Sequence, residues 1–401
     1  QAVQHLFPGA TGHFSLIQGC YWMTYCILIS FSSLYLLDRG FTNTQIGLLL
    51  GIAGLTAAIL QPFVGAKGDH LKVLSLRQFT SLPIAAMILC GVGLFLVPAK
   101  PVQAALYMVL LVLLQLLTPL IYSLGMDCLN NHIELNFGLA RGIGGGTYAL
   151  ASAVCGSLAA ALGARVIPLV LVVAVALMLA FTFTFRQGGP VKSTLPKPDA
   201  LPQSDGTPFL KKYPQVLPLL IGVILLYTSH NVIMNFPYQI VRSLGCGSAE
   251  MGHYLTLQSL MDIPAMVVFS LLLKRASSRA WVRLTGISFF LHALLTWLAP
   301  NLPFLMVVQV FEMSGYALYS VSSVYFVNEM VDLCDRVQGQ TYFTMANTIG
   351  IVLSSVLGGR LLDLGGASAA LCLATVTGAA GMVILWFLLR RKSLRPATNA
   401  A

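Results

Sequence analysis

The stretch VQAALYMVLLVLLQLLTPLIYSLGM, residues 102–126, contains no charged side chain. A helix needs about 20 predominantly apolar residues, at a rise of about 1.5 Å per residue, to cross the hydrocarbon core of a bilayer. This stretch meets that length without interruption by charge. It therefore predicts a transmembrane α-helix.

Stretches of the same kind recur along most of the chain. We expect twelve spans, at residues 14–37, 43–66, 76–97, 102–126, 139–162, 166–185, 214–238, 250–273, 281–299, 303–327, 339–362 and 367–390. Most connections between them are short, so consecutive helices should be antiparallel neighbours. The predicted fold class is all-α, a polytopic membrane protein.

The composition agrees with a membrane protein and excludes several other classes. Hydrophobic residues make up 57% of the 401 residues, mean hydropathy is +0.82, and only 9% are charged, against roughly 25% in soluble domains. The eight cysteines show no CxxC spacing, so we expect free thiols rather than a disulfide framework or zinc site. No metal or other cofactor is expected.

The basic residues predict the orientation of the chain. If both termini are cytoplasmic, all but five of the 23 Lys and Arg residues fall on or near the inner side. The five exceptions are Arg39, Lys100, Arg165, Arg242 and Arg360. This bias is the positive-inside rule, and it explains the net charge of +10 without a nucleic-acid partner. We expect a multi-pass protein of the cell membrane.

A polar segment divides the predicted spans into six and six. Residues 186–213 contain five prolines among Lys and Asp and read as a cytoplasmic linker. The predicted bundles are residues 1–185 and 214–392, followed by a cytoplasmic tail at 393–401.

The two halves also share a pattern. Gly40–Gly47 and Gly245–Gly252 have the same glycine spacing, and each precedes a span with an internal proline. Chance glycine spacing is the alternative in a chain with 36 glycines. Repeated halves are nevertheless a recurring plan in transporters, with the binding site where they meet. We therefore expect two pseudo-symmetric six-helix bundles.

The loop after the second predicted span reads Gly65-Ala-Lys-Gly-Asp69-His-Leu-Lys72. It resembles the signature loop of the major facilitator superfamily, although Lys67 and His70 depart from the usual pattern. The resemblance implies transport by alternating access. It also implies a gating role for Gly65, Asp69 and Lys72.

Four further elements resemble the lactose-permease-like branch of that superfamily, the oligosaccharide:proton symporters. They are Gln61–Gly65, Phe137–Arg141 with the glycine-rich run to Tyr148, Met261–Pro264, and Phe311-Glu312. The resemblance implies that Glu312 is the protonation site.

The candidates for proton coupling are ionisable residues inside predicted spans, where they cost at least about 2.5–3.5 kcal/mol. Glu312 lies nine residues into its span among apolar neighbours, and burial disfavours the charged form of a carboxyl. His292 lies where the resembling family has an arginine, and would itself titrate near neutrality. Asp262 stands two residues before Pro264, where the helix would bend. For each residue, a structural hydrogen bond is the alternative role.

The candidates for substrate binding centre on the fifth predicted span. Arg141 offers a planar fork of donors, and Tyr148, seven residues later, shares its helix face. The resemblance implies that both contact a sugar; the alternative is that Arg141 only anchors the cytoplasmic end of its helix. Where the family has an acid in the fourth span this chain has Ser123; Asp127, one turn on, could substitute. Other candidates are Tyr25, Tyr122, Asn231, Asn235, Tyr316 and Asn347, with His230 noted as a further polar residue of the seventh span.

These patterns predict a secondary transporter rather than an enzyme. We expect proton-coupled uptake of a small, uncharged or weakly charged polar solute, such as a saccharide or a related polyol or nucleoside. Proton-driven export of amphipathic compounds is the alternative, and an integral-membrane enzyme is disfavoured because Asp69-His70 is better explained as the facilitator loop. The partners are the solute, protons and the lipid bilayer, and we expect a monomer.

Overall fold

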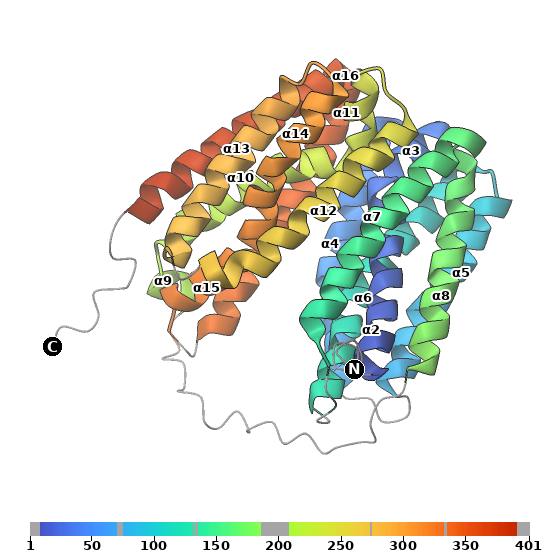
Figure 1. Cartoon of the computed structure of the whole chain (residues 1–401), viewed down its shortest axis with the longest axis horizontal. Coiled ribbons are helices and arrows are strands. Elements are labelled where there is room, and N and C mark those ends of the chain that lie inside the picture. The colour runs from blue at the N-terminus through green and yellow to red at the C-terminus, as the bar shows by residue number, and fades with distance from the viewer. Residues whose placement is uncertain are drawn as a thin grey trace. The chain divides into compact units, whose positions relative to one another are not determined.

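The computed structural model describes residues 9–69, 75–130, 133, 135–185, 208–272, 275–332 and 335–390. Within these ranges every regular element is a helix (Figure 1). The chain forms two compact units. Unit 1 comprises Gln1–Ser193 and Asn235–Leu260, and unit 2 comprises Thr194–Met234 and Met261–Ala401.

Unit 1 is organised around α2, which packs against α7 and α8, while α5 packs against α6 and α8 and α4 packs against α6. Its elements are α2 (Gly9–Tyr25), η1 (Cys26–Ser30), α3 (Ser32–Asp38), α4 (Asn43–Asp69), α5 (Leu76–Leu96), α6 (Lys100–Asn130), α7 (Phe137–Leu162), η2 (Ala164–Val166), α8 (Ile167–Thr184), α11 (Pro237–Ser243) and the first part of α12 (Ser248–Leu272).

Unit 2 is organised around α13, which packs against α14, α15 and α16. Its elements are α9 (Phe209–Lys212), α10 (Val216–Asn235, of which Asn235 belongs to unit 1), the rest of α12, α13 (Ser278–Trp297), α14 (Leu302–Glu312), η4 (Met313–Ala317), α15 (Leu318–Met330) and α16 (Arg336–Arg390). Tyr213, Tyr319 and Phe289 are among the largest buried side chains of its apolar core.

Several helices begin at residues whose side chains accept the otherwise unpaired first N–H groups. Ser75 accepts from the backbone of Gln78, whose side chain bonds back to Ser75 in a capping box. The side chains of Asn136, Ser277 and Asn301 each accept a backbone N–H in the first turn of α7, α13 and α14, without a capping box. These caps lie within four residues of the predicted span starts.

Eight helices of the described residues are long and apolar enough to cross a membrane, or nine if the bent pair Gly9–Ser30 and Ser32–Asp38 forms one span. The all-α membrane fold is therefore confirmed, while the count of twelve stays a prediction. One of the eight, Gln338–Arg390, contains two predicted spans. Gly366, with φ of +67°, breaks the helical backbone between them, because glycine adopts positive φ without a Cβ clash.

An ion-pair cluster joins the end of α9 to the connection between α15 and α16. The Lys212 ammonium lies 2.6 Å from Oδ2 of Asp335 and 3.1 Å from Oδ2 of Asp332. The buried Tyr213 hydroxyl lies 2.9 Å from both of these oxygens and accepts the backbone N–H of Asp332. The hydrogen bond to Asp335 raises the pKa of Lys212, and burial raises the pKa of Tyr213 to about 12.

Both raised pKa values belong to groups that hold their protons more tightly in the folded protein. Their stabilisation is therefore complete below the unfolded-state pKa values of about 10 and is lost only as the pH rises through the higher folded values. The cluster therefore contributes its full stabilisation of the folded protein at neutral pH.

We expect Lys212→Met to destabilise unit 2 by about 3–5 kcal/mol, because it leaves the nearly buried Asp335 carboxylate without its cation. Lys212→Met combined with Asp335→Asn should recover most of that loss. Thermal unfolding of the detergent-solubilised protein measures both. Lys211→Met is the matched control, because Lys211 is exposed. A double variant as unstable as Lys212→Met alone would contradict a pairwise role.

Candidate functional site

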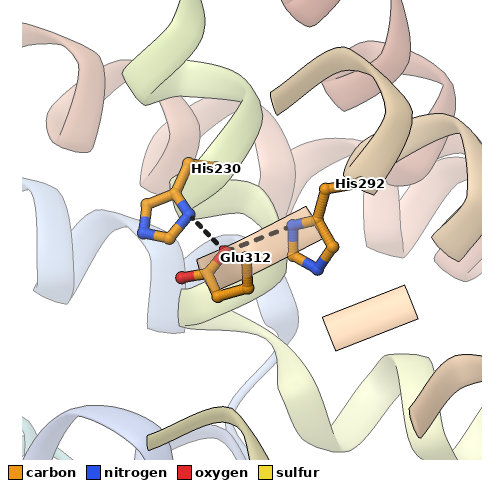
Figure 2. A group of neighbouring side chains, drawn as sticks. All are labelled: His230, His292 and Glu312. Carbon is orange, nitrogen blue, oxygen red and sulfur yellow. Dashed lines mark ion pairs between the residues drawn. The ribbon is translucent and has the colours of Figure 1, made fainter. Parts of the chain in front are cut away.

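Three titratable side chains from three helices of unit 2 meet inside the protein (Figure 2). His230 comes from α10, His292 from α13, and Glu312 is the last residue of α14. The Nδ1 atoms of the two histidines each lie 3.3 Å from the same carboxylate oxygen, Oε2 of Glu312. The three side chains are 3%, 1% and 1% exposed, in that order. We call this group the His-Glu-His triad.

The local backbone changes form directly after Glu312. The π-helix η4 follows α14. Such wider turns are rare in proteins as a whole, and those that occur inside helices are often found at functional sites. Within η4, Tyr316 stacks flat on the His230 ring, with centroids 4.6 Å apart and an interplanar angle of 6°. Phe289 of α13 meets the same imidazole edge-on at 5.6 Å. Aromatic packing therefore holds His230 beside the carboxylate.

The triad can hold and pass on a proton. A proton on either histidine forms an ion pair with the Glu312 carboxylate, and a proton on Glu312 leaves all three groups neutral. Both arrangements contain the same number of protons and have zero net charge, so the proton can move among the groups without burying a net charge. Loading or releasing one proton changes the charge by one unit, which is costly in a buried site. A change of hydration or of bound ligand must accompany that step.

The same side chains are of the chemical types that bind a transition metal. The candidate ligand atoms of His230, His292 and Glu312 all lie within 4.8 Å of one another. Two imidazoles and one carboxylate suit zinc or iron and would leave coordination positions open. The donor set thus fits a metal ion as well as a proton, although no metal was expected from the sequence. The two interpretations make different experimental predictions.

Sequence reasoning singled out two members of the triad. Glu312 and His292 are both sequence candidates for proton coupling, and the structure places them in contact. His230 was noted only as a polar residue, because its partnership arises from the packing of α10 beside α13 and η4, which no local pattern reports. Asp262, the third expected coupling residue, lies on α12 with partial exposure. It is not part of the group whose ligand atoms lie within 4.8 Å.

In unit 1, the expected substrate residue Arg141 lies against an aromatic side chain that sequence reasoning missed. The guanidinium carbon of Arg141, on α7, is 4.0 Å from the ring centroid of Trp22, on α2. Tyr25 packs 5.1 Å from the same indole. A cation over an aromatic face is a favourable arrangement.

Tyr148, the other residue expected to contact the solute, is engaged between helices. Its hydroxyl lies 2.6 Å from the hydroxyl of Ser30 in η1, and the residue is only 8% exposed. Tyr148 therefore links α7 to η1 in this conformation.

The remaining expected substrate residues are distributed over both units. Tyr122 and Asp127 lie on α6, and Asn235 ends α10; all three belong to unit 1. In unit 2, Asn231 donates to the carbonyl of Tyr227 in its own helix, and Asn347 lies on α16. Of the expected gating residues, Gly65 and Asp69 are in the last turns of α4, whereas Lys72 and the side chain of Asp69 lie outside the described residues.

Comparison with known proteins decides the family. The model of the MFS_1 like family matches residues 15–372, which is most of the chain and includes the triad. The chain belongs to the MFS_1-like family. No curated protein matches the sequence significantly.

Solved structures share the fold of this MFS_1-like protein at low sequence identity. A single-residue mutant of the nucleoside transporter NupG has a TM-score of 0.78 and 14% identity, covering 95% of this chain and 98% of that chain. A bacterial homologue of the iron transporter ferroportin, in its inward-facing state, has a TM-score of 0.70 and 14% identity, with coverages of 95% and 99%. An auto-inhibited POT family peptide transporter has a TM-score of 0.69 and 10% identity, with coverages of 98% and 99%.

Family and fold together establish the general class of this MFS_1-like protein. It is a multi-pass membrane transporter of the major facilitator type and not an enzyme. Structural similarity at sequence identities of 10–14% shows a shared fold and does not show a shared solute or coupling ion. The solute and the coupling ion must therefore be argued from the side chains.

Proposed function

We propose that this protein is a proton-coupled secondary transporter that takes up a small polar solute, such as a saccharide, by alternating access. The observation that carries the proposal is the buried Glu312 carboxylate between His230 and His292. A buried acid with two titratable partners can bind a proton on one side of the membrane and release it on the other when the hydration of the site changes. The resemblance of Phe311-Glu312 to the lactose-permease-like symporters supports the same assignment.

The proposal includes the expected topology and state of association. Both termini are cytoplasmic, following the distribution of basic residues, and the protein acts as a monomer. Gly65, Asp69 and Lys72 form the cytoplasmic gate that the signature loop implies.

Transport into proteoliposomes tests the proposal. We expect counterflow of a radiolabelled solute without any gradient, and accumulation above the external concentration when the pH outside is lower than inside. Accumulation only under the reversed gradient would favour export of amphipathic compounds. If counterflow occurs but no pH gradient produces accumulation above the external concentration, transport is not coupled to protons.

The competing metal interpretation is tested in the same vesicles. Proton coupling through the triad predicts unchanged transport after chelation of divalent cations. Loss of transport on chelation, with recovery on adding Zn²⁺ or Fe²⁺, would instead assign the triad to a metal ion.

A further inference from the structure

Arg141 of unit 1 is a partly buried cation whose partner is an aromatic ring. Its guanidinium carbon lies 4.0 Å above Trp22. Among the described residues Arg141 forms no ion pair, since the pairs found there involve Lys212, His230 and His292. It also donates no hydrogen bond within that part of the chain.

Arg141 is the third residue of the candidate span Leu139–Leu162, so its charge costs less there than it would at the bilayer centre. Charged side chains in spans are expensive and normally pair with one another or serve transport. The aromatic contact with Trp22 offsets part of that cost. Among the described residues, no hydrogen-bond acceptor engages the five N–H donors of the guanidinium. The edge of the guanidinium, where these donors lie, matches the two oxygens of one carboxylate in a bidentate pair.

The packing around Trp22 holds its indole in place, so that the indole can orient the Arg141 guanidinium. A Cβ at Gly144 of α7 would lie 2.4 Å from Cδ1 of Trp22, so the glycine is what allows the indole to lie against α7 beside Arg141. Tyr21 meets the indole at 87° and 5.4 Å, while its own hydroxyl bonds to Thr118 of α6. The cation-bearing surface is therefore built by α2, α6 and α7 of one unit.

We propose that Arg141, positioned by Trp22, binds the single carboxylate of the transported solute, so that the substrate class is polar monocarboxylates, including sugar acids, rather than neutral saccharides. This inference rests on the proposed transport function and replaces the neutral saccharide named there as an example with an acidic polar solute. One fork of donors suits one carboxylate. Trp22 is a positioning residue that acts through Arg141.

The chain offers a direct optical test at equilibrium. It has four tryptophans, so the triple variant Trp281→Phe, Trp297→Phe, Trp386→Phe leaves Trp22 as the only indole. Titration in detergent with D-glucuronate and D-glucose, and with benzoate and benzyl alcohol, compares each carboxylate with a neutral partner of similar shape. We expect a saturable change of Trp22 emission with the carboxylates at an apparent Kd at least about tenfold lower than with the neutral partners.

Variants separate binding from general perturbation. In the single-tryptophan protein, Arg141→Lys should weaken carboxylate binding about tenfold, since it keeps the charge and loses the fork, and Arg141→Gln should abolish it. Gly144→Ala, which pushes on Trp22, should weaken it several-fold. Gly146→Ala is the matched control, because a Cβ there meets nothing within 4 Å.

Three results would overturn the assignment: equal affinity for D-glucose and D-glucuronate, no saturable response to any carboxylate, or wild-type affinity in Arg141→Gln. The measurement uses no gradient. It therefore succeeds or fails independently of proton coupling, which only the proteoliposome experiment addresses.

Discussion

Glu312→Gln should abolish uphill accumulation of the solute while leaving counterflow close to the wild-type rate. The amide has the shape of the protonated carboxyl but can neither gain nor lose a proton. In the structure the Glu312 oxygen is the common neighbour of His230 and His292, so both imidazoles lose their anionic partner. Exchange of loaded carriers needs no deprotonation and should continue.

The measurement is the steady-state ratio of internal to external radiolabelled solute under an imposed pH gradient. In Glu312→Gln this ratio should fall to the value reached without a gradient. Glu329→Gln is the matched control, because it makes the same chemical change at an acid of α15 that accepts from Ser278 and lies outside the triad. Normal accumulation in Glu312→Gln would remove Glu312 from the coupling mechanism.

Much of the fold follows from apolar length alone. Residues 102–126 lie within α6, and residues 76–97 coincide almost entirely with α5, because a long, predominantly apolar segment satisfies its backbone hydrogen bonds in a bilayer by forming a helix. The break at Gly366 also falls between two predicted spans. Hydropathy does not predict the π-helix η1 that precedes α3, or the 48° bend there, since both depend on backbone hydrogen bonds and tertiary packing.

The candidate site was predictable only where a residue was chemically unusual for its surroundings. A glutamate among Val310, Phe311 and Met313 is conspicuous in any span, and so is a histidine in the ninth. His230 and Trp22 were harder to find, because each gains its meaning from a partner on another helix. The same limit applies to Tyr148, whose bond to Ser30 depends on how α7 packs against η1.

A close helix crossing in unit 1 leads to the second large effect. A Cβ at Gly156 of α7 would lie 2.6 Å from the carbonyl oxygen of Ser248 and 2.8 Å from Cα of Gly252, both on α12. Hydroxyl groups extend the contact along both helices: Thr256 donates to the carbonyl of Ala149, and Ser259 donates to that of Gly145, each at 2.9 Å. The backbones of α7 and α12 are in direct contact here, so no side-chain rotation can relieve the clash that an added group would cause.

Gly156→Leu should therefore prevent this contact between α7 and α12 and slow counterflow by about tenfold or more, since overpacking of this kind costs about 1–3 kcal/mol. Alternating access requires the protein to pass through each of its conformations. Excluding one of these conformations should stop turnover, while solute still binds to the conformations that remain.

Gly156→Ala should give a smaller loss of the same kind, and Gly146→Ala should give none, because its Cβ would meet nothing within 4 Å. The initial counterflow rate and the Trp22 emission titration, measured on the same preparations, separate turnover from binding. Wild-type counterflow in Gly156→Leu would show that transport does not require α7 and α12 to approach this closely.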